Sequence, residues 1–124
     1  LGIIPGDGGA WFLQRIVGYQ RAAELTLSGR IIDADEALSY GILLEIVPTG
    51  DLLNRAGELA DSFAAKPPRG LRMSKRLLRA AQRMELRDLL DFSASMQSIS
   101  HHTSDHVEAV SAFLEKRQPE FHGE

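Results

Sequence analysis

Apolar residues recur mainly at helical spacing along this sequence, which predicts a chain that is mostly α-helical. Three short apolar runs are instead predicted to be extended: the opening run Leu1–Ile4, Arg30–Ile32, and Ile42–Val47, which Pro48 closes. Helices are expected directly after a glycine-rich turn at residues 5–9, and then from Tyr19 to Ser28, Ala34 to Tyr40, Asp51 to Ala65, Pro68 to Met84, Leu86 to about Ser100, and from Thr103 or Ser104 to Arg117.

Local signals mark where several of these helices begin and end. Asp33, followed three residues later by Glu36, has the form of an N-terminal capping box. Gly29 and Gly41 are placed to end the helices before them, because glycine readily adopts the left-handed conformation found at helix C-termini. A proline pair at 67–68 breaks the chain, and its second member suits the first turn of a new helix.

The helix predicted from Pro68 has two contrasting faces. Five apolar residues are expected to face inward: Leu71, Met73, Leu77, Leu78 and Ala81. Five arginines form what we call the basic stripe on the outer face: Arg69, Arg72, Arg76, Arg79 and Arg83. The last predicted helix has an apolar stripe made by Val107, Val110, Ser111 and Leu114. We therefore expect the helical second half to pack against more than this chain alone.

The turn from Pro5 to Gly9 is the stretch richest in chemical possibilities. Three glycines in four residues allow a tight turn with positive φ. A helix that begins there leaves several N–H groups without intrahelical acceptors, which suits an oxygen ligand such as water, a carboxylate or a carbonyl. The spacing matches neither GxxxxGK(S/T) nor GxGxxG, which disfavours a nucleotide site. Reversal of the chain direction is the alternative role.

Composition restricts the class of protein. The 124 residues suffice for one domain with a core, 44% of them are hydrophobic, and no apolar run is long enough to span a membrane. Cysteine is absent, which excludes disulfides, zinc–thiolate sites and thiol nucleophiles in this chain. The sequence opens at Leu1 inside an apolar run and without an initiator methionine, so we expect it to begin within a longer protein.

The net charge of −3 conceals an uneven distribution, because residues 66–87 hold eight basic side chains against the single Glu85. This segment raises the alternative of a surface for nucleic acid or an acidic partner. The chain is acidic overall and no aromatic residues interleave with the basic stripe, which favours a solvated face instead.

The histidines near residue 104 raise the question of a metal site. His102 and His106 are four residues apart with Asp105 between them, a spacing that supplies metal ligands only on one continuous helix. Thr103 and Ser104 instead indicate a cap between two helices, so we expect a polar corner and no metal. No serine can be placed near a base, and no Ser-His-Asp triad is predicted.

A series of motifs runs through the chain in order. They are LGIIPGDGG at 1–9, RIVG at 15–18, AELTLSGRIIDADEA at 23–37, GIL at 41–43, VP at 47–48, KPP at 66–68, SKRLL at 74–78, EAV at 108–110 and AFLEKRQPEF at 112–121. This series resembles the C-terminal half of the crotonase (enoyl-CoA hydratase/isomerase) superfamily, and it covers essentially all 124 residues.

The resemblance implies an α/β crotonase-like fold, the ClpP/crotonase ββα spiral, of which this chain would be a mostly helical part with a few short strands. Residues 1–66 would form the end of the spiral core with the active-site glycine turn. Residues 67–124 would form a C-terminal helical region for trimerisation and CoA contact. The resemblance also implies a homotrimer or a dimer of trimers, with no membrane association.

The implied activity is that of an enzyme acting on acyl-CoA thioesters, adding water to an enoyl-CoA or shifting its double bond. In the family two peptide N–H groups hold the thioester oxygen as an enolate-like anion forms. In the hydratases two glutamates act as general acid and base. Those glutamates would precede Leu1, so this chain alone is expected to be inactive. CoA is part of the substrate, no separate cofactor is expected, and the expected location is cytoplasmic.

Two residues of the turn and one beside it are the implied active-site residues. Gly6 matches the glycine whose N–H helps to hold the catalytic water in hydratases. Asp7 departs from the small residue usual there and aligns near the nucleophilic aspartate of the 4-chlorobenzoyl-CoA dehalogenase branch; it would take part in chemistry or cap the next helix. Trp11 and Phe12 replace polar groups, which indicates a bulkier, ring-containing acyl group or core packing.

Phe113 and Lys116 match family positions that contact the CoA moiety, often across a subunit boundary. Phe113 lies off the apolar stripe of its helix, and Lys116 suits a phosphate group. A solvated helix end, where a cation complements the helix dipole, is the alternative. For the whole protein two alternatives stay open: another crotonase reaction on a ring-containing acyl-CoA (isomerase, hydrolase or dehalogenase) using Asp7, and a non-catalytic assembly or RNA-binding module.

Overall fold

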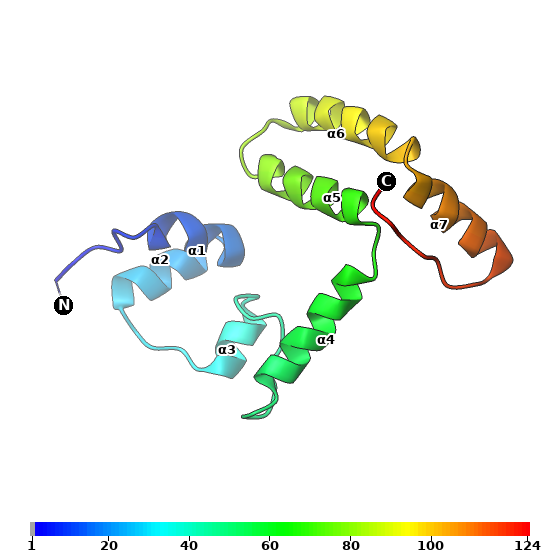
Figure 1. Ribbon diagram of the computed structural model, residues 1–124. Coiled ribbons are helices and arrows are strands. Elements are labelled where there is room, and N and C mark those ends of the chain that lie inside the picture. Colours follow the sequence, from blue (N-terminus) through cyan, green and yellow to red (C-terminus); the bar gives the residue numbers. More distant parts are fainter. Residues whose placement is uncertain (1) are drawn as a thin grey trace. The chain divides into compact units, whose positions relative to one another are not determined.

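The computed structural model describes residues 2–124, and Leu1, the first residue of the predicted opening run, lies outside them. The chain divides into two compact units, residues 1–52 and residues 53–124. Helices account for the regular structure of both (Figure 1). Within residues 2–124 no helix is both long enough and apolar enough to cross a membrane.

The described part of the first unit contains helices α1 (Gly9–Val17), α2 (Tyr19–Ser28) and α3 (Ala34–Ser39), and α1 packs against α2 (Figure 1). A single residue, Gly18, separates α1 from α2. It has φ 79° and ψ 163°, a conformation that residues with a side chain rarely adopt. The N–H of Gly18 donates to the carbonyl of Gln14, so the residue that redirects the chain also caps α1.

The predicted signals around α3 are largely confirmed. The Asp33 carboxylate accepts the Glu36 N–H at 2.8 Å and so caps the helix. Gly29 ends α2 in the left-handed conformation with φ 62°. The second half of the expected capping box differs, because the Glu36 carboxylate pairs with Arg30 and Tyr40.

The second unit contains most of α4 (Leu52–Ala64), together with α5 (Pro68–Ala81), α6 (Leu86–His101) and α7 (Ser104–Glu115). α5 packs against α6, and α6 against α7. Thr103 caps α7, because its hydroxyl accepts the His106 N–H at 3.1 Å. Met96 and Ala112 are the buried apolar residues of this unit, with exposed fractions of 7% and 1%. The predicted functional division at 66/67 differs from this boundary between units, and it stays a prediction.

The predicted short strands are absent from residues 2–124. The segments 30–32 and 42–47 are irregular instead. A strand needs a neighbouring strand to satisfy its N–H and C=O groups. Here the N–H groups of Ile42 and Leu43 turn back to the carbonyl of Ala37, and the side chains of Ile31 and Leu44 are exposed. The apolar β-branched composition therefore predicted strands that this part of the chain does not form.

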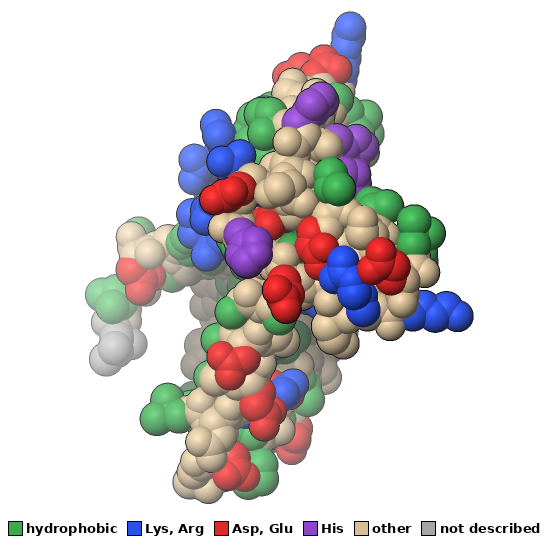
Figure 2. All heavy atoms as spheres, turned by 45° about the vertical axis from the view of Figure 1, so that its right-hand side comes forward, with side chains coloured by type: hydrophobic (Ala, Val, Ile, Leu, Met, Phe, Trp, Pro, Cys, Tyr) green, Lys and Arg blue, Asp and Glu red, His purple; other side chains and the backbone are tan. Residues whose placement is uncertain are grey.

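Many large apolar side chains reach the surface, and Figure 2 shows hydrophobic side chains scattered across the visible face. On α5, Met73 and Leu77 are half-buried, whereas Leu78, predicted to face inward, is 72% exposed. On α7 the predicted apolar stripe is also exposed, since Asp105 and Ala112 occupy the buried face. The polar C-terminal segment packs on that face through Asp105, which leaves the apolar stripe uncovered within this chain.

Candidate functional site

The predicted glycine turn is present and leads directly into α1. Gly8, with φ 95° and ψ 2°, is the N-cap residue, and its carbonyl accepts the N–H groups of Trp11 and Phe12, each at 3.0 Å. Gly9 lies so close to Pro5 that a Cβ atom on Gly9 would come 3.2 Å from the proline Cβ. The glycines therefore serve two purposes, a left-handed backbone at one position and close approach at the next.

Gly6 and Asp7 lie side by side in this turn, with different environments. The Gly6 N–H donates to the carbonyl of Ile4 at 2.8 Å. A Cβ atom on Gly6 would meet nothing within 4 Å, so the space beside it is open. Asp7 is exposed, and α1 has Gly8 as its cap with no side-chain capping bond. The Asp7 carboxylate is therefore available to solvent, and the alternative in which it caps the helix does not hold.

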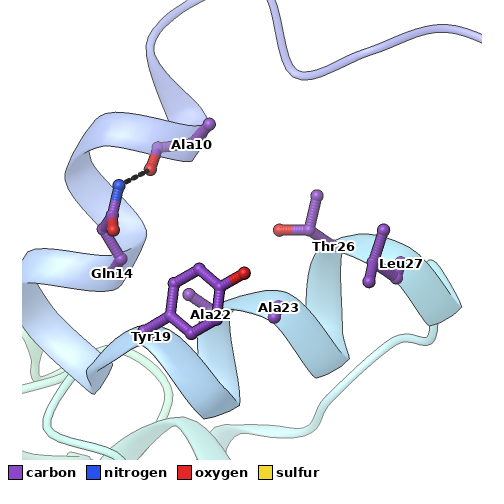
Figure 3. A pocket seen from close by; sticks show the side chains of 7 residues that line it. All are labelled: Ala10, Gln14, Tyr19, Ala22, Ala23, Thr26 and Leu27. Atoms are coloured by element: carbon purple, nitrogen blue, oxygen red, sulfur yellow. Dashed lines mark hydrogen bonds between the residues drawn. The ribbon is translucent and has the colours of Figure 1, made fainter.

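Two open hollows adjoin the turn within the first unit. One is bounded by residues 3–7 and by Thr26 of α2. The other, about 220 Å³, lies between α1 and α2 (Figure 3). Its lining residues are Ala10, Gln14, Tyr19, Ala22, Ala23, Thr26 and Leu27. Because Thr26 lines both, the turn that carries Gly6 and Asp7 borders concave, largely apolar surface of the kind that small molecules bind.

Trp11 is half-buried on α1 and is held by its own neighbours. The Arg15 guanidinium carbon lies 3.6 Å from the centroid of the indole ring, and the Phe12 ring stands edge-on to it at 4.8 Å. Ala10 and Gln14, on another face of the helix, line the hollow between α1 and α2. The structure thus places Trp11 beside the turn in sequence but not among the residues that line either hollow.

Phe113 and Lys116 lie together at the C-terminal end of α7, in the second unit. Phe113 is 81% exposed, and Lys116 is also exposed. Lys116 adopts the left-handed conformation, with φ 55° and ψ 37°, and its N–H donates to the Phe113 carbonyl at 3.3 Å. Both side chains are therefore accessible at one helix end, as a ligand contact requires.

A family model described as Enoyl-CoA hydratase/isomerase matches residues 1–124. The chain belongs to the enoyl-CoA hydratase/isomerase family. It is 37% identical over 123 residues to the 1,2-epoxyphenylacetyl-CoA isomerase of Escherichia coli strain K12, covering 99% of this chain and 47% of the relative. It is also 37% identical over 123 residues to the 2,3-dehydroadipyl-CoA hydratase of that strain, covering 99% of this chain and 48% of the relative.

Solved structures of enoyl-CoA hydratases show the same fold as this family member. The enzyme from Bacillus anthracis superimposes with a TM-score of 0.93 at 36% identity, over 99% of this chain and 48% of the other. The enzyme from Geobacillus kaustophilus HTA426 gives a TM-score of 0.92 at 30% identity, over 99% and 47%. The chain spans about half the length of the relatives it matches.

The most extensive polar contacts of this crotonase-family chain were not predicted. Asp105, only 2% exposed, accepts the N–H of His122 at 2.8 Å and that of Gly123 at 2.9 Å. Glu108 accepts the Glu120 N–H at 2.9 Å. We call Asp105, Glu108 and their bonds to residues 117–124 the carboxylate latch. The spacing of two acids three residues apart on α7, opposite the apolar stripe, is the signal that could have revealed it.

Ion pairing lowers the pKa of the latch glutamate. Arg117 donates through Nη2 to Glu108 Oε2 at 2.8 Å, and this contact, with the Glu120 N–H second, lowers the pKa of Glu108 to about 2. The same guanidinium donates through Nε to Glu115 at 2.6 Å. Glu108 is therefore ionised and paired at neutral pH, which makes it a structural carboxylate rather than an acid–base catalyst.

A second unpredicted cluster surrounds Arg30 in the first unit. Its guanidinium donates to Glu24 and to Glu36, and the Tyr40 hydroxyl donates to Glu36 at 2.7 Å. The hydrogen bonds from Arg30 lower the pKa of Glu36 to about 2 and also lower the pKa of Glu24. Both carboxylates are thus tied to one cation within a family motif, where they join α2 to α3.

The histidine corner between α6 and α7 does not assemble a metal site within residues 2–124. The predicted break between the helices is confirmed, since α6 ends at His101 and α7 starts at Ser104. The rings of His101 and His106 stack at 4.8 Å between centroids, whereas His102 Nδ1 lies 2.7 Å from the Ser98 carbonyl oxygen. The break therefore turns His102 away from the pair.

Four arginines of the basic stripe lie on α5, and the fifth, Arg83, lies just beyond its end. All five arginines are exposed, and Arg76 places its guanidinium carbon 5.2 Å from the centroid of the Phe92 ring. Among the described residues the ion pairs that the structure shows involve other arginines: Arg30, Arg55 and Arg117. A solvated face is the simplest description of this surface.

Proposed function

We propose that the protein is an acyl-CoA-processing enzyme that adds water to an enoyl-CoA thioester or shifts its double bond. The observation that carries this proposal is the family match over residues 1–124, together with a glycine turn that borders a concave surface. The similarity to a relative named 2,3-dehydroadipyl-CoA hydratase supports a thioester conjugated to a double bond as the substrate.

We further propose that this chain corresponds to the C-terminal half of its relatives. The order of its motifs supports this, and the chain spans about half of their length. On this proposal residues 1–66 complete the ββα spiral, and the two acid–base glutamates lie in the unmatched half. Glu24, Glu36 and Glu108 are each paired with an arginine, which supports assigning proton transfer elsewhere. The chain alone would then bind the thioester without converting it.

Gly6 and Asp7 are the proposed contribution of the turn to catalysis. The open space beside Gly6 lets a water molecule approach the backbone, where a side chain would stand in its way. Asp7 presents an exposed carboxylate next to that space. The role proposed for this turn is to position the reacting water, because a carboxylate can accept a hydrogen bond from water.

Phe113 and Lys116 are proposed to contact the CoA moiety. Their exposure at one helix end supports this, because an aromatic ring can stack on a base and an ammonium can pair with a phosphate. We propose a homotrimer or a dimer of trimers, to which residues 67–124 contribute their exposed apolar side chains. The proposed reaction uses no cofactor besides the CoA of the substrate, and a cytoplasmic location remains a prediction.

The second candidate is a crotonase-type reaction on a ring-containing acyl-CoA. Two observations favour it: the similarity to a relative named 1,2-epoxyphenylacetyl-CoA isomerase, and the exposed Asp7 carboxylate. In this alternative Asp7 acts directly on the acyl group, and Trp11 contributes to the preference for a ring.

A chimera tests these proposals. This chain would replace the matched segment of the Escherichia coli 2,3-dehydroadipyl-CoA hydratase, and crotonyl-CoA turnover would be followed by loss of the ultraviolet absorbance of the conjugated thioester. We expect turnover by the chimera and none by the chain alone. A folded chimera that neither binds nor converts any acyl-CoA would refute the proposal, and salt-sensitive retention on an RNA column would then favour the non-catalytic module. Turnover by the chain alone would refute only the assignment of the glutamates.

A further inference from the structure

The chain reverses direction sharply at Lys116. Among residues 2–124 this is the one residue other than glycine with positive φ. The N–H of Arg117 donates to the Ala112 carbonyl at 3.0 Å, which closes the end of α7 in the way usual for a left-handed cap. Glycine normally occupies such a position because a side chain is strained there. The backbone of a lysine at this position therefore needs support from its surroundings.

The carboxylate latch provides that support. After the reversal, residues 117–124 run back along α7, where Asp105 binds the N–H groups of His122 and Gly123 through separate carboxylate oxygens. Ser104 adds a hydroxyl bond to the Glu124 carbonyl at 2.9 Å. A carboxylate that is 2% exposed is stable only when charge-assisted bonds of this kind satisfy it, so the segment is held firmly.

Glu108 fixes the segment closer to the reversal. It binds the backbone of Glu120 and the guanidinium of Arg117, the residue directly after Lys116. With both sides of the turn held, by α7 before it and by Arg117 after it, the Lys116 backbone has little freedom. Its side chain and that of Phe113 then leave a helix end whose backbone is held in place, and both side chains are exposed there.

We propose that Asp105 and Glu108 are positioning residues, which hold Lys116 and Phe113 in the arrangement that contacts coenzyme A. This inference rests on the proposed function, because it takes those two residues as the CoA contacts. It adds that CoA recognition by this chain depends on two carboxylates that themselves carry the wrong charge to touch a phosphate.

The test is titration calorimetry of the protein with coenzyme A, comparing Asp105→Asn, Lys116→Gln and the double variant. Asp105→Asn should weaken binding about tenfold, the scale of one charge-assisted contact. It should also reduce the salt dependence of binding to that of Lys116→Gln, because both variants lose the same ion contact. The double variant should bind no more weakly than Lys116→Gln. The matched control is Asp88→Asn, an exposed aspartate in the first turn of α6, which should bind as the unaltered protein does.

Circular dichroism establishes that each variant is folded, and Glu108→Gln, at a partly exposed position, replaces Asp105→Asn if the latter unfolds. Normal binding by the folded latch variants, or losses that add to that of Lys116→Gln, would overturn the positioning role alone. If the unaltered protein fails to bind coenzyme A, the proposed function itself is overturned, and this role with it.

Discussion

Arg30 lies with its Nη2 atom 2.6 Å from Glu36 Oε1, a contact that ties the segment after α2 to α3. The same guanidinium places its Nε 2.7 Å from Glu24 Oε1 on α2, so one side chain bridges two carboxylates. The planar fork of arginine can bond both partners in a fixed geometry, whereas the single ammonium of lysine cannot. Among residues 2–52 only Ala22 and Ala37 are buried apolar residues, so this bridge matters more to the first unit than a surface ion pair usually does.

Replacing Arg30 with lysine or glutamine should therefore lower the melting temperature of the first unit by a few degrees. Lysine should not restore the loss, because it cannot serve both glutamates. Trp11, the chain's single tryptophan, lies in this unit, and its fluorescence reports the transition. Arg72→Gln, at an exposed position of the basic stripe, is the control and should leave the transition unchanged.

Stability should decrease with acidification over a window that the glutamates define. The pKa of Glu36 and that of Glu108 are each lowered from 4.5 to about 2 by their arginine partners. Because the pKa is lower in the folded state, the stabilisation is complete above about pH 4.5 and is lost as the pH falls through about 2. Melting temperatures should fall as the pH is lowered through this range. In Arg30→Gln the melting temperature reported by Trp11 fluorescence should depend less on pH. An equally steep decrease in Arg30→Gln would contradict this explanation.

The hydroxyl of Thr103 should be important for α7. It accepts the His106 N–H and donates to the Ser100 carbonyl at 2.7 Å, so it satisfies groups at the end of one helix and the start of the next. Thr103→Ala should lower the free energy of unfolding by about 1 kcal/mol, the usual contribution of an N-cap. Urea denaturation measures the change. Thr103→Ser keeps the hydroxyl and should restore most of the loss.

Ala112 tests how tightly the latch side of α7 is packed. Its side chain is 1% exposed, so Ala112→Leu should destabilise the protein by about 1–3 kcal/mol through overpacking. The same substitution at exposed Ala94 of α6 is the control, since both positions are helical alanines. Equal denaturation midpoints for the two variants would show that Ala112 has more room than the structure gives it.

The role of Asp7 can be tested in the chimera with two substrates. If Asp7 acts only on ring-containing acyl groups, Asp7→Asn should lower kcat for a ring-containing acyl-CoA by about 10²–10⁴, the usual range for a lost acid–base group. In that case hydration of crotonyl-CoA should stay within about twofold, since it would not use the Asp7 carboxylate. Asp35→Asn, an exposed aspartate in the first turn of α3, controls for loss of charge. Equal losses on both substrates would assign Asp7 to both reactions.

Helix boundaries were the most predictable part of the fold. Asp33, Gly29 and Pro68 act within one turn of chain, so their effect does not depend on distant residues. Burial was less predictable. The apolar stripe on α7 was recognised, but the face that the chain itself covers was not, because that depends on a segment that bonds back from residues 117–124. The strands expected at 30–32 and 42–47 are absent from the described residues, because a strand depends on pairing neighbours that periodicity does not reveal.

The candidate site also has parts that were predictable from local sequence and parts that were not. The turn at Gly6 and Asp7 was predictable because glycine spacing dictates local backbone geometry. The position of Trp11 away from both hollows was not predictable. It depends on which face of α1 the indole ring occupies, and there the Arg15 guanidinium covers the ring. Asp105 was considered only as a possible metal ligand between histidines. Asp105 instead accepts the backbone N–H groups of His122 and Gly123. Because every residue except proline has a backbone N–H, a sequence motif cannot reveal such partners.

Gly18 gives the first unit an unusual tolerance to change. The direction of α2 relative to α1 is set at one backbone position, and three of the seven residues that line the hollow between them are alanines. Exchanges at the residues facing the hollow can thus alter its size and polarity while the two helices keep their mutual angle. Proteins that keep this glycine can change, one substitution at a time, which molecules the hollow accommodates. Loss of the glycine would instead shift all of the lining residues together.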